Sequence, residues 1–184
     1  MWRAWTGVGL ESCRLTVTAT GVEAEGVALG LEEDRPWAVH YTVRCDAGWR
    51  ARELAVQSLA GDGGTLVLTG DGIGGWADGR GQRLPALDGC LDVDLMCTPF
   101  TNTLPIRRIG MVAGWSEELT VAYVAVPGLE VSVSRQRYQC VRWGPDGGRY
   151  RFEALATGFT AEIAVDGDGL VVEYPGVARR LWSR

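Results

Sequence analysis

The sequence predicts a mainly β fold, and three observations support this prediction. Apolar and polar residues alternate with a period of two through much of the 184-residue chain, which is the pattern of strands with one buried face. The chain has 26 glycines but only 7 prolines, and several of the glycines follow aspartate, where a tight hairpin needs a positive φ. The alternating runs recur about every 8–12 residues, so we expect roughly a dozen or more short strands.

Four runs define the expected strands most clearly: residues 36–45, 119–126, 129–138 and 158–165. In the first run Trp37, Val39, Tyr41 and Val43 share one face. Both faces of the second run are apolar, so we expect that strand to be buried on both sides. Turn signals separate the runs at residues 61–64, 71–72, 145–148 and 166–169. No internal repeat or linker interrupts the pattern, which predicts one domain over residues 1–184.

One segment breaks the alternation and predicts a short helix over about residues 99–109. The helix could begin at either of two positions. Thr98 could be its N-cap, with proline in the first turn, or Thr103 could be the N-cap of a helix that begins later. In both cases two arginines, at positions 107 and 108, fall in the last turn and suit the helix dipole. Gly110 then ends the helix.

Composition excludes several classes of function. The net charge of −5 argues against a nucleic-acid partner, because such proteins concentrate positive charge. All 18 basic residues are arginine, so Schiff-base and Walker-lysine chemistry are excluded. One histidine and five cysteines without Cys-x-x-Cys spacing predict no metal site and no cofactor. We find no leader and no apolar stretch of the roughly 20 residues that span a bilayer, and therefore expect a soluble cytoplasmic protein without an integral membrane segment.

The centre of the chain resembles the hallmark of the putative glycolipid-binding family of bacteria. The matching segments are Leu91–Leu95 (LDVDL) and Thr98–Arg108 (TPFTNTLPIRR), and weaker matches run from Gly9–Glu11 to Tyr174–Pro175. The resemblance implies a spiral β-roll, in which a long antiparallel sheet of about 12–15 strands wraps around one short central helix. It also implies a homodimer, and a shape similar to that of lipoprotein carriers that hold acyl chains under a curved sheet.

Three carboxylates are candidate catalytic residues: Asp92, Asp94 and Glu11. Asp92 and Asp94 stand two apart in a predicted strand, which places their side chains on one face about 6.5–7 Å apart. Such a pair could act as acid and base or bind a cation. The alternative that we favour is structural, with both aspartates paired to Arg107 and Arg108 of the neighbouring helix, because an unpaired buried carboxylate is costly.

Candidate ligand-binding residues cluster around the predicted helix or are aromatic. Hydroxyl and amide groups at the helix start could hydrogen-bond a sugar headgroup, or could cap the helix. Tryptophan and tyrosine rings could stack on sugars or line an acyl cavity, although a strand tryptophan is more often part of the core. We expect Trp49 and Trp76, which follow turn-like segments, at the rim of a site. The full set is Trp49, Trp76, Thr98, Thr101, Asn102, Thr103, Arg107, Arg108 and Tyr138.

The sequence therefore predicts a non-enzymatic binding protein for an amphipathic small molecule, a lipid or glycolipid held in an apolar groove. Two alternatives stay open. The first is an enzyme acting on a sugar or lipid ester through its paired carboxylates. The second is a structural homodimer without ligand, whose tryptophan-rich face forms the subunit interface.

Overall fold

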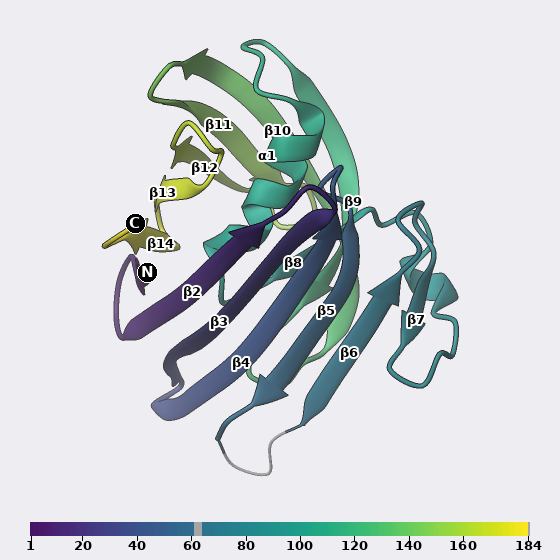
Figure 1. The fold of residues 1–184 in the computed structure, drawn as a ribbon. Helices are drawn as coiled ribbons and strands as arrows, with labels where there is room; N and C mark the ends of the chain where they lie inside the picture. The colour runs from purple at the N-terminus through teal and green to yellow at the C-terminus, as the bar shows by residue number, and fades with distance from the viewer. Residues whose placement is uncertain (61–63, 184) are drawn as a thin grey trace.

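The computed structural model describes residues 1–60 and 64–183, which form one mixed 14-stranded sheet wrapped around a short helical segment (Figure 1). The order of strands in the sheet is β7-β6-β5-β4-β3-β2-β1-β14-β13-β12-β11-β10-β9-β8. The strands are β1 Trp2–Ala4, β2 Gly9–Val17, β3 Gly21–Glu32, β4 Arg35–Asp46, β5 Ala51–Ser58, β6 Thr65–Gly70, β7 Trp76–Asp78, β8 Asp92–Leu95, β9 Ser116–Val124, β10 Val131–Gly144, β11 Gly147–Ala154, β12 Phe159–Val165, β13 Val171–Tyr174 and β14 Ala178–Arg180. This architecture is the mainly β roll that the sequence predicted.

Consecutive strands are antiparallel neighbours except around β8: β7 and β8 form the two edges of the sheet and do not pair, and β8 pairs with β9 in parallel. The two ends of the chain also meet in the sheet, since β1 pairs with β14 in the register Trp2 to Arg180. In the parallel pair, Asp94 faces Tyr123. The prediction of a wholly antiparallel sheet is therefore corrected at this edge. A parallel pair needs a crossover connection, and the helical segment between these two strands provides it.

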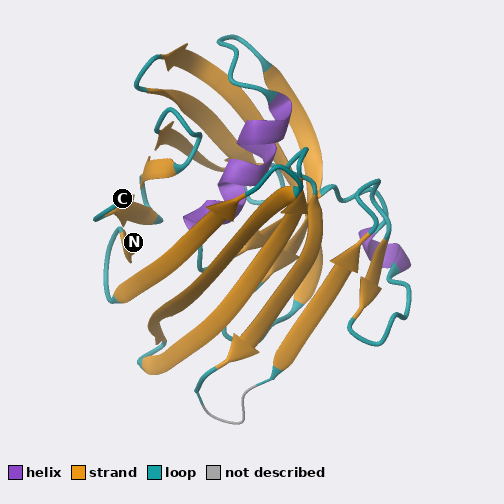
Figure 2. Cartoon of the chain, viewed as in Figure 1, coloured by secondary structure: helices purple, strands orange, loops and turns teal. Residues whose placement is uncertain are grey.

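The helical segment lies inside the curve of the sheet (Figure 2). It begins with a 3-10 turn, η2 (Pro99–Asn102), and continues as α1 (Thr103–Ile109). The Thr98 hydroxyl accepts a hydrogen bond from the Phe100 amide at 3.1 Å, so the first of the two predicted starts is the one observed. Gly110, at φ 99°, ends the segment, as predicted. Phe100, Leu104 and Ile106 are fully buried and anchor it in the core.

Four chain reversals use the same aspartate turn, and two of them fall at the predicted turn signals of residues 71–72 and 166–169. One side-chain oxygen of the aspartate accepts the amides two and four residues later, with Asp46, Asp71, Asp78 and Asp166 in this role. The residue three positions after the aspartate has a positive φ, and it is glycine in three of the turns but Trp49, at φ 62°, in the fourth. A side chain at that φ is disfavoured, so Trp49 is held there by its contacts. A further predicted turn, at residues 61–64, lies largely outside the described residues.

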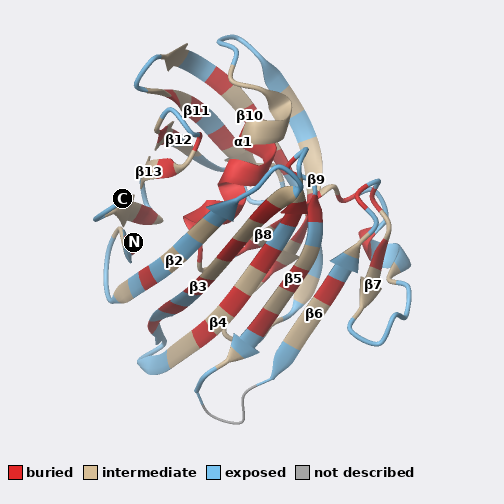
Figure 3. Ribbon diagram, viewed as in Figure 1, coloured by how far each residue is buried: buried red, intermediate tan, exposed pale blue. Residues whose placement is uncertain are grey.

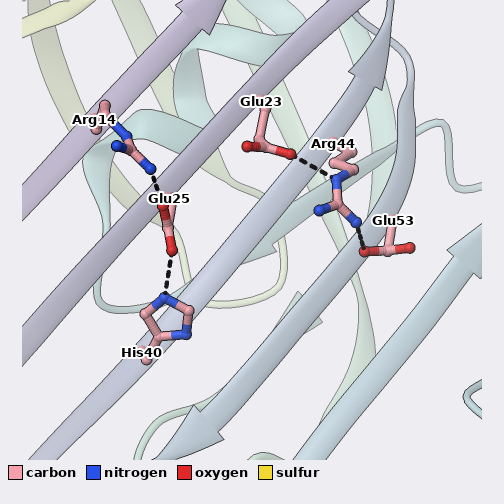
Figure 4. A network of polar contacts seen from close by, with 6 residues as sticks. All are labelled: Arg14, Glu23, Glu25, His40, Arg44 and Glu53. Atoms are coloured by element: carbon pink, nitrogen blue, oxygen red, sulfur yellow. Dashed lines mark hydrogen bonds and ion pairs between the residues drawn. The ribbon is translucent and has the colours of Figure 1, made fainter.

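The two faces of the N-terminal strands differ sharply in burial (Figure 3). The inner face buries the predicted side chains Val39, Tyr41 and Val43 against the helical segment and β8. The outer face of β2–β5 carries two exposed ion-pair networks, which consist of Arg14, Glu25 and His40, and of Glu23, Arg44 and Glu53 (Figure 4). Exposed pairs of this kind add little stability, but they mark this face as solvated. The core and any internal site therefore lie on the inner face.

No helix within residues 1–60 and 64–183 has the length and apolar character required to cross a membrane.

Candidate functional site

A chain of hydrogen bonds crosses the inside of the roll from the helical segment to β8. The Asn102 amide donates to the Tyr138 hydroxyl at 2.8 Å, this hydroxyl donates to Gln136 Oε1 at 3.4 Å, and Gln136 Nε2 donates to Asp94 Oδ2 at 2.6 Å. Thr101 adds a second donor to Asp94 at 3.2 Å. Each hydrogen bond in this series is donated in the direction of Asp94. This direction suits an ionised carboxylate, because a carboxylate can only accept hydrogen bonds. Burial raises the pKa of Asp94 above its usual range, and the bonds from Gln136 and Thr101 oppose that shift.

A cavity of about 450 Å³ opens beside this hydrogen-bond chain; we call it the Asp94 cavity. Its polar side is formed by Asp94, Asn102 and Gln136, with the hydroxyls of Thr98, Ser132, Ser134 and Tyr123. Its apolar side includes Phe152, Phe159 and Tyr174, whose ring centroids lie 5.8–6.3 Å apart. The volume lies in the range of pockets that hold small molecules, and a polar side opposite an aromatic one suits an amphipathic guest.

Several predicted site residues meet here. Thr98 and Asn102 line the Asp94 cavity, while Thr101 and Tyr138 hold its polar side chains in place through the bonds described above. The predicted capping role of Thr98 is confirmed, since its hydroxyl accepts from the Phe100 amide. Sequence reasoning did not select Gln136 or the three rings of β11–β13 as site residues. Even-numbered Gln136 and Tyr138 share a face of β10, and that alternation was the available signal.

Three other predicted ligand-binding residues do not line the Asp94 cavity. Trp76, expected at a rim, is only 2% exposed, and its ring nitrogen donates to the Cys90 carbonyl at 2.7 Å. Trp49 packs in the core, with the Arg107 guanidinium 4.9 Å from its ring centroid. Thr103 is fully buried, and its hydroxyl has no partner among the described residues, so it does not cap the helix. Both tryptophan rings belong to the hydrophobic core that also contains Leu54 and Leu104.

The expected ion pairs form only in part. Arg108 pairs with the fully buried Asp92 at 2.5 Å, as predicted for these two residues. Asp94 receives neutral donors instead of an arginine, and Arg107 donates to the Asp168 carbonyl at 3.2 Å instead of pairing with a carboxylate. The reason is geometric, since Arg107 and Arg108 are adjacent on a helix and point in different directions. With Asp92 closed off by Arg108, the two aspartates do not form an open acid and base pair.

Glu11, the third candidate catalytic carboxylate, lies on β2 apart from the Asp94 cavity. Its Oε1 accepts from the Thr98 hydroxyl at 2.6 Å and from the Tyr41 hydroxyl. Burial raises its pKa from 4.5 to about 7, and the bonds from Thr98 and Tyr41 oppose the shift. Glu11 lines a second cavity, which adjoins the first.

Fold and site together define the class of this chain: a β-roll around a short helix, with an amphipathic cavity of small-molecule size on its inner face. The chain belongs to the putative glycolipid-binding family, whose model matches residues 1–180. This agrees with the resemblance seen in the hallmark segments.

A crystal structure of a DUF1089 family protein from Pseudomonas aeruginosa is similar to the chain at 37% sequence identity and a TM-score of 0.82, and the match covers 98% of this chain and 96% of that one. No curated protein matches the chain significantly. Family membership supports a binding role.

Proposed function

We propose that this protein binds an amphipathic small molecule, a lipid or glycolipid, in the Asp94 cavity. The single observation that carries the proposal is the division of the cavity, with a preorganised polar side on β8, β10 and η2 and an aromatic side on β11–β13. Hydroxyls of a headgroup would bond to Asp94, Asn102 and Gln136. Hydrocarbon would pack on Phe152 and Phe159, where each 100 Å² of buried apolar surface contributes about 2.5 kcal/mol.

Two features favour binding over catalysis. The hydrogen-bond chain fixes Asn102, Tyr138 and Gln136 in place before any ligand arrives, which reduces the entropy lost on binding. Asp92, which would be the partner of Asp94 in an acid and base pair, is held by Arg108.

The first experiment is native mass spectrometry of protein purified from a lipid-producing bacterial host, with its organic extract analysed in parallel. We expect a lipid or glycolipid bound at one molecule per chain. The same spectra report whether the protein is the homodimer that we also propose. A ligand-free dimer would contradict the carrier proposal and favour the interface alternative.

A pair of variants tests the position of the site. Ser132→Trp fills the Asp94 cavity, because Ser132 lines it and shares the face of β10 that carries Gln136. Val141→Trp is its control, since Val141 is also exposed on β10 but does not line the cavity. We expect the first to lose the co-purified lipid and the second to keep it. Equal retention by both would place the ligand elsewhere and refute this site.

A further inference from the structure

The second cavity, of about 470 Å³, adjoins the Asp94 cavity; we call it the Glu11 cavity. Met96 and Val177 line both cavities and so form the partition between them. Thr98 also connects the two, because it lines the Asp94 cavity while its hydroxyl donates to Glu11. Met96 is 40% exposed, and an unbranched thioether side chain can move aside at little cost. The hydrocarbon chain of a ligand could therefore displace Met96 and extend from one cavity into the other.

The walls of the Glu11 cavity are mostly apolar. They include Trp2, Trp37, Leu10 and Leu29. The ring nitrogen of Trp2 is already occupied, because it donates to the Val171 carbonyl at 2.9 Å. These walls suit a hydrocarbon segment better than a sugar.

One side chain in this lining, that of Glu11, has a carboxyl oxygen without a partner in the part of the chain that the structure describes. Glu11 is 3% exposed, and its Oε1 accepts from both Tyr41 and Thr98, but its Oε2 is buried without a hydrogen-bond partner among the described residues. Leaving a buried carboxyl oxygen unpaired is costly. A ligand group that pairs with Oε2 would therefore gain more here than in water.

We propose that the Glu11 cavity is the second compartment of the binding groove, and that it receives the ligand's hydrocarbon chain and selects a chain bearing a hydroxyl group, which pairs with Glu11. This inference rests on the proposed function and names the ligand class more closely.

A hydroxyl is the group that fits both ionisation states of Glu11. An ionised carboxylate only accepts, whereas a protonated one can also donate. The raised pKa of Glu11, about 7, populates both forms near neutral pH. A hydroxyl pairs with either form, while a carbonyl pairs only with the acid and an ammonium group pairs well only with the anion. An ammonium group would also lose its hydration among the tryptophan and leucine walls.

The test compares methyl dodecanoate with its 2-, 3- and 12-hydroxy derivatives in fluorescence titrations of the delipidated protein. We expect the wild type to bind one hydroxy ester about five- to tenfold more tightly than the plain ester, the value of one well-placed hydrogen bond. Glu11→Met should abolish this preference. Glu11→Gln, which keeps an acceptor for Tyr41 and Thr98 and a donor for the ligand, should retain it. Equal binding of all four esters by the wild type would overturn the inference.

A second pair of variants keeps the test decisive if Glu11→Met does not fold. Ala28→Leu narrows the Glu11 cavity, and Ala24→Leu is its control, because both alanines are buried on the inner face of β3 and only Ala28 lines the cavity. We expect Ala28→Leu alone to weaken ester binding. If Ser132→Trp abolishes binding while Ala28→Leu leaves it intact, the ligand is confined to the Asp94 cavity, so the inference fails and the proposed function stands. If neither variant weakens binding, both fail.

Discussion

Glu11→Gln should make the protein less sensitive to rising pH. Glu11 is buried on the inner face, and burial raises the pKa of its carboxyl from 4.5 to about 7, against the opposing bonds from Thr98 and Tyr41. Because the folded-state pKa lies above the unfolded one, the folded state binds the proton more tightly. The stability that this proton contributes is complete below pH 4.5 and is lost as the pH rises through about 7.

The size of the effect follows from the displacement of the pKa. Each pKa unit corresponds to about 1.4 kcal/mol, so a shift from 4.5 to about 7 corresponds to about 3 kcal/mol. Glutamine has the shape of the protonated carboxyl and does not titrate. The free energy of unfolding of the variant, minus that of the wild type, should therefore rise by about 3 kcal/mol between pH 4.5 and 8.

Urea unfolding at several pH values across this range measures that difference. Burial also raises the pKa values of Asp92 and Asp94, and their effects have the same sign, but both residues are present in both proteins and cancel. The neighbouring thiols of Cys13 and Cys97 have pKa values raised by burial and stay neutral throughout. A difference that is constant across the pH range would refute the assignment of a buried, proton-binding Glu11.

Two further predictions concern stability and are checked by urea or thermal unfolding. Arg108→Met should cost about 3–5 kcal/mol because it leaves the fully buried carboxylate of Asp92 without its cation, and adding Asp92→Asn should recover much of the loss; no recovery would contradict the ion-pair explanation. Gly26→Ala should cost about 1–3 kcal/mol, since a Cβ there would lie 2.6 Å from the Tyr41 ring. Gly144→Ala, whose Cβ would meet nothing closer than 4.0 Å, is the control, and equal losses in the two variants would refute the steric argument.

The sequence determined the elements of this fold with good accuracy. The alternating run at residues 36–45 became β4 (Arg35–Asp46), and that at 158–165 became β12 (Phe159–Val165). The helical segment begins after Thr98 and ends at Gly110, as predicted. These features were predictable because strand alternation, capping and turn formation depend on residues close together in the chain.

Only the tertiary structure decided which side chains meet. The sequence could not show that Asp92 pairs with Arg108 while Asp94 accepts from Gln136, 42 residues away. It also could not show that Thr98 links Glu11, 87 residues away, to the Asp94 cavity. These contacts depend on how far the sheet curves and where its two halves close on the helical segment. A cavity is the space that packing leaves unfilled, so it is a property of the rolled sheet as a whole and leaves no local pattern in the sequence.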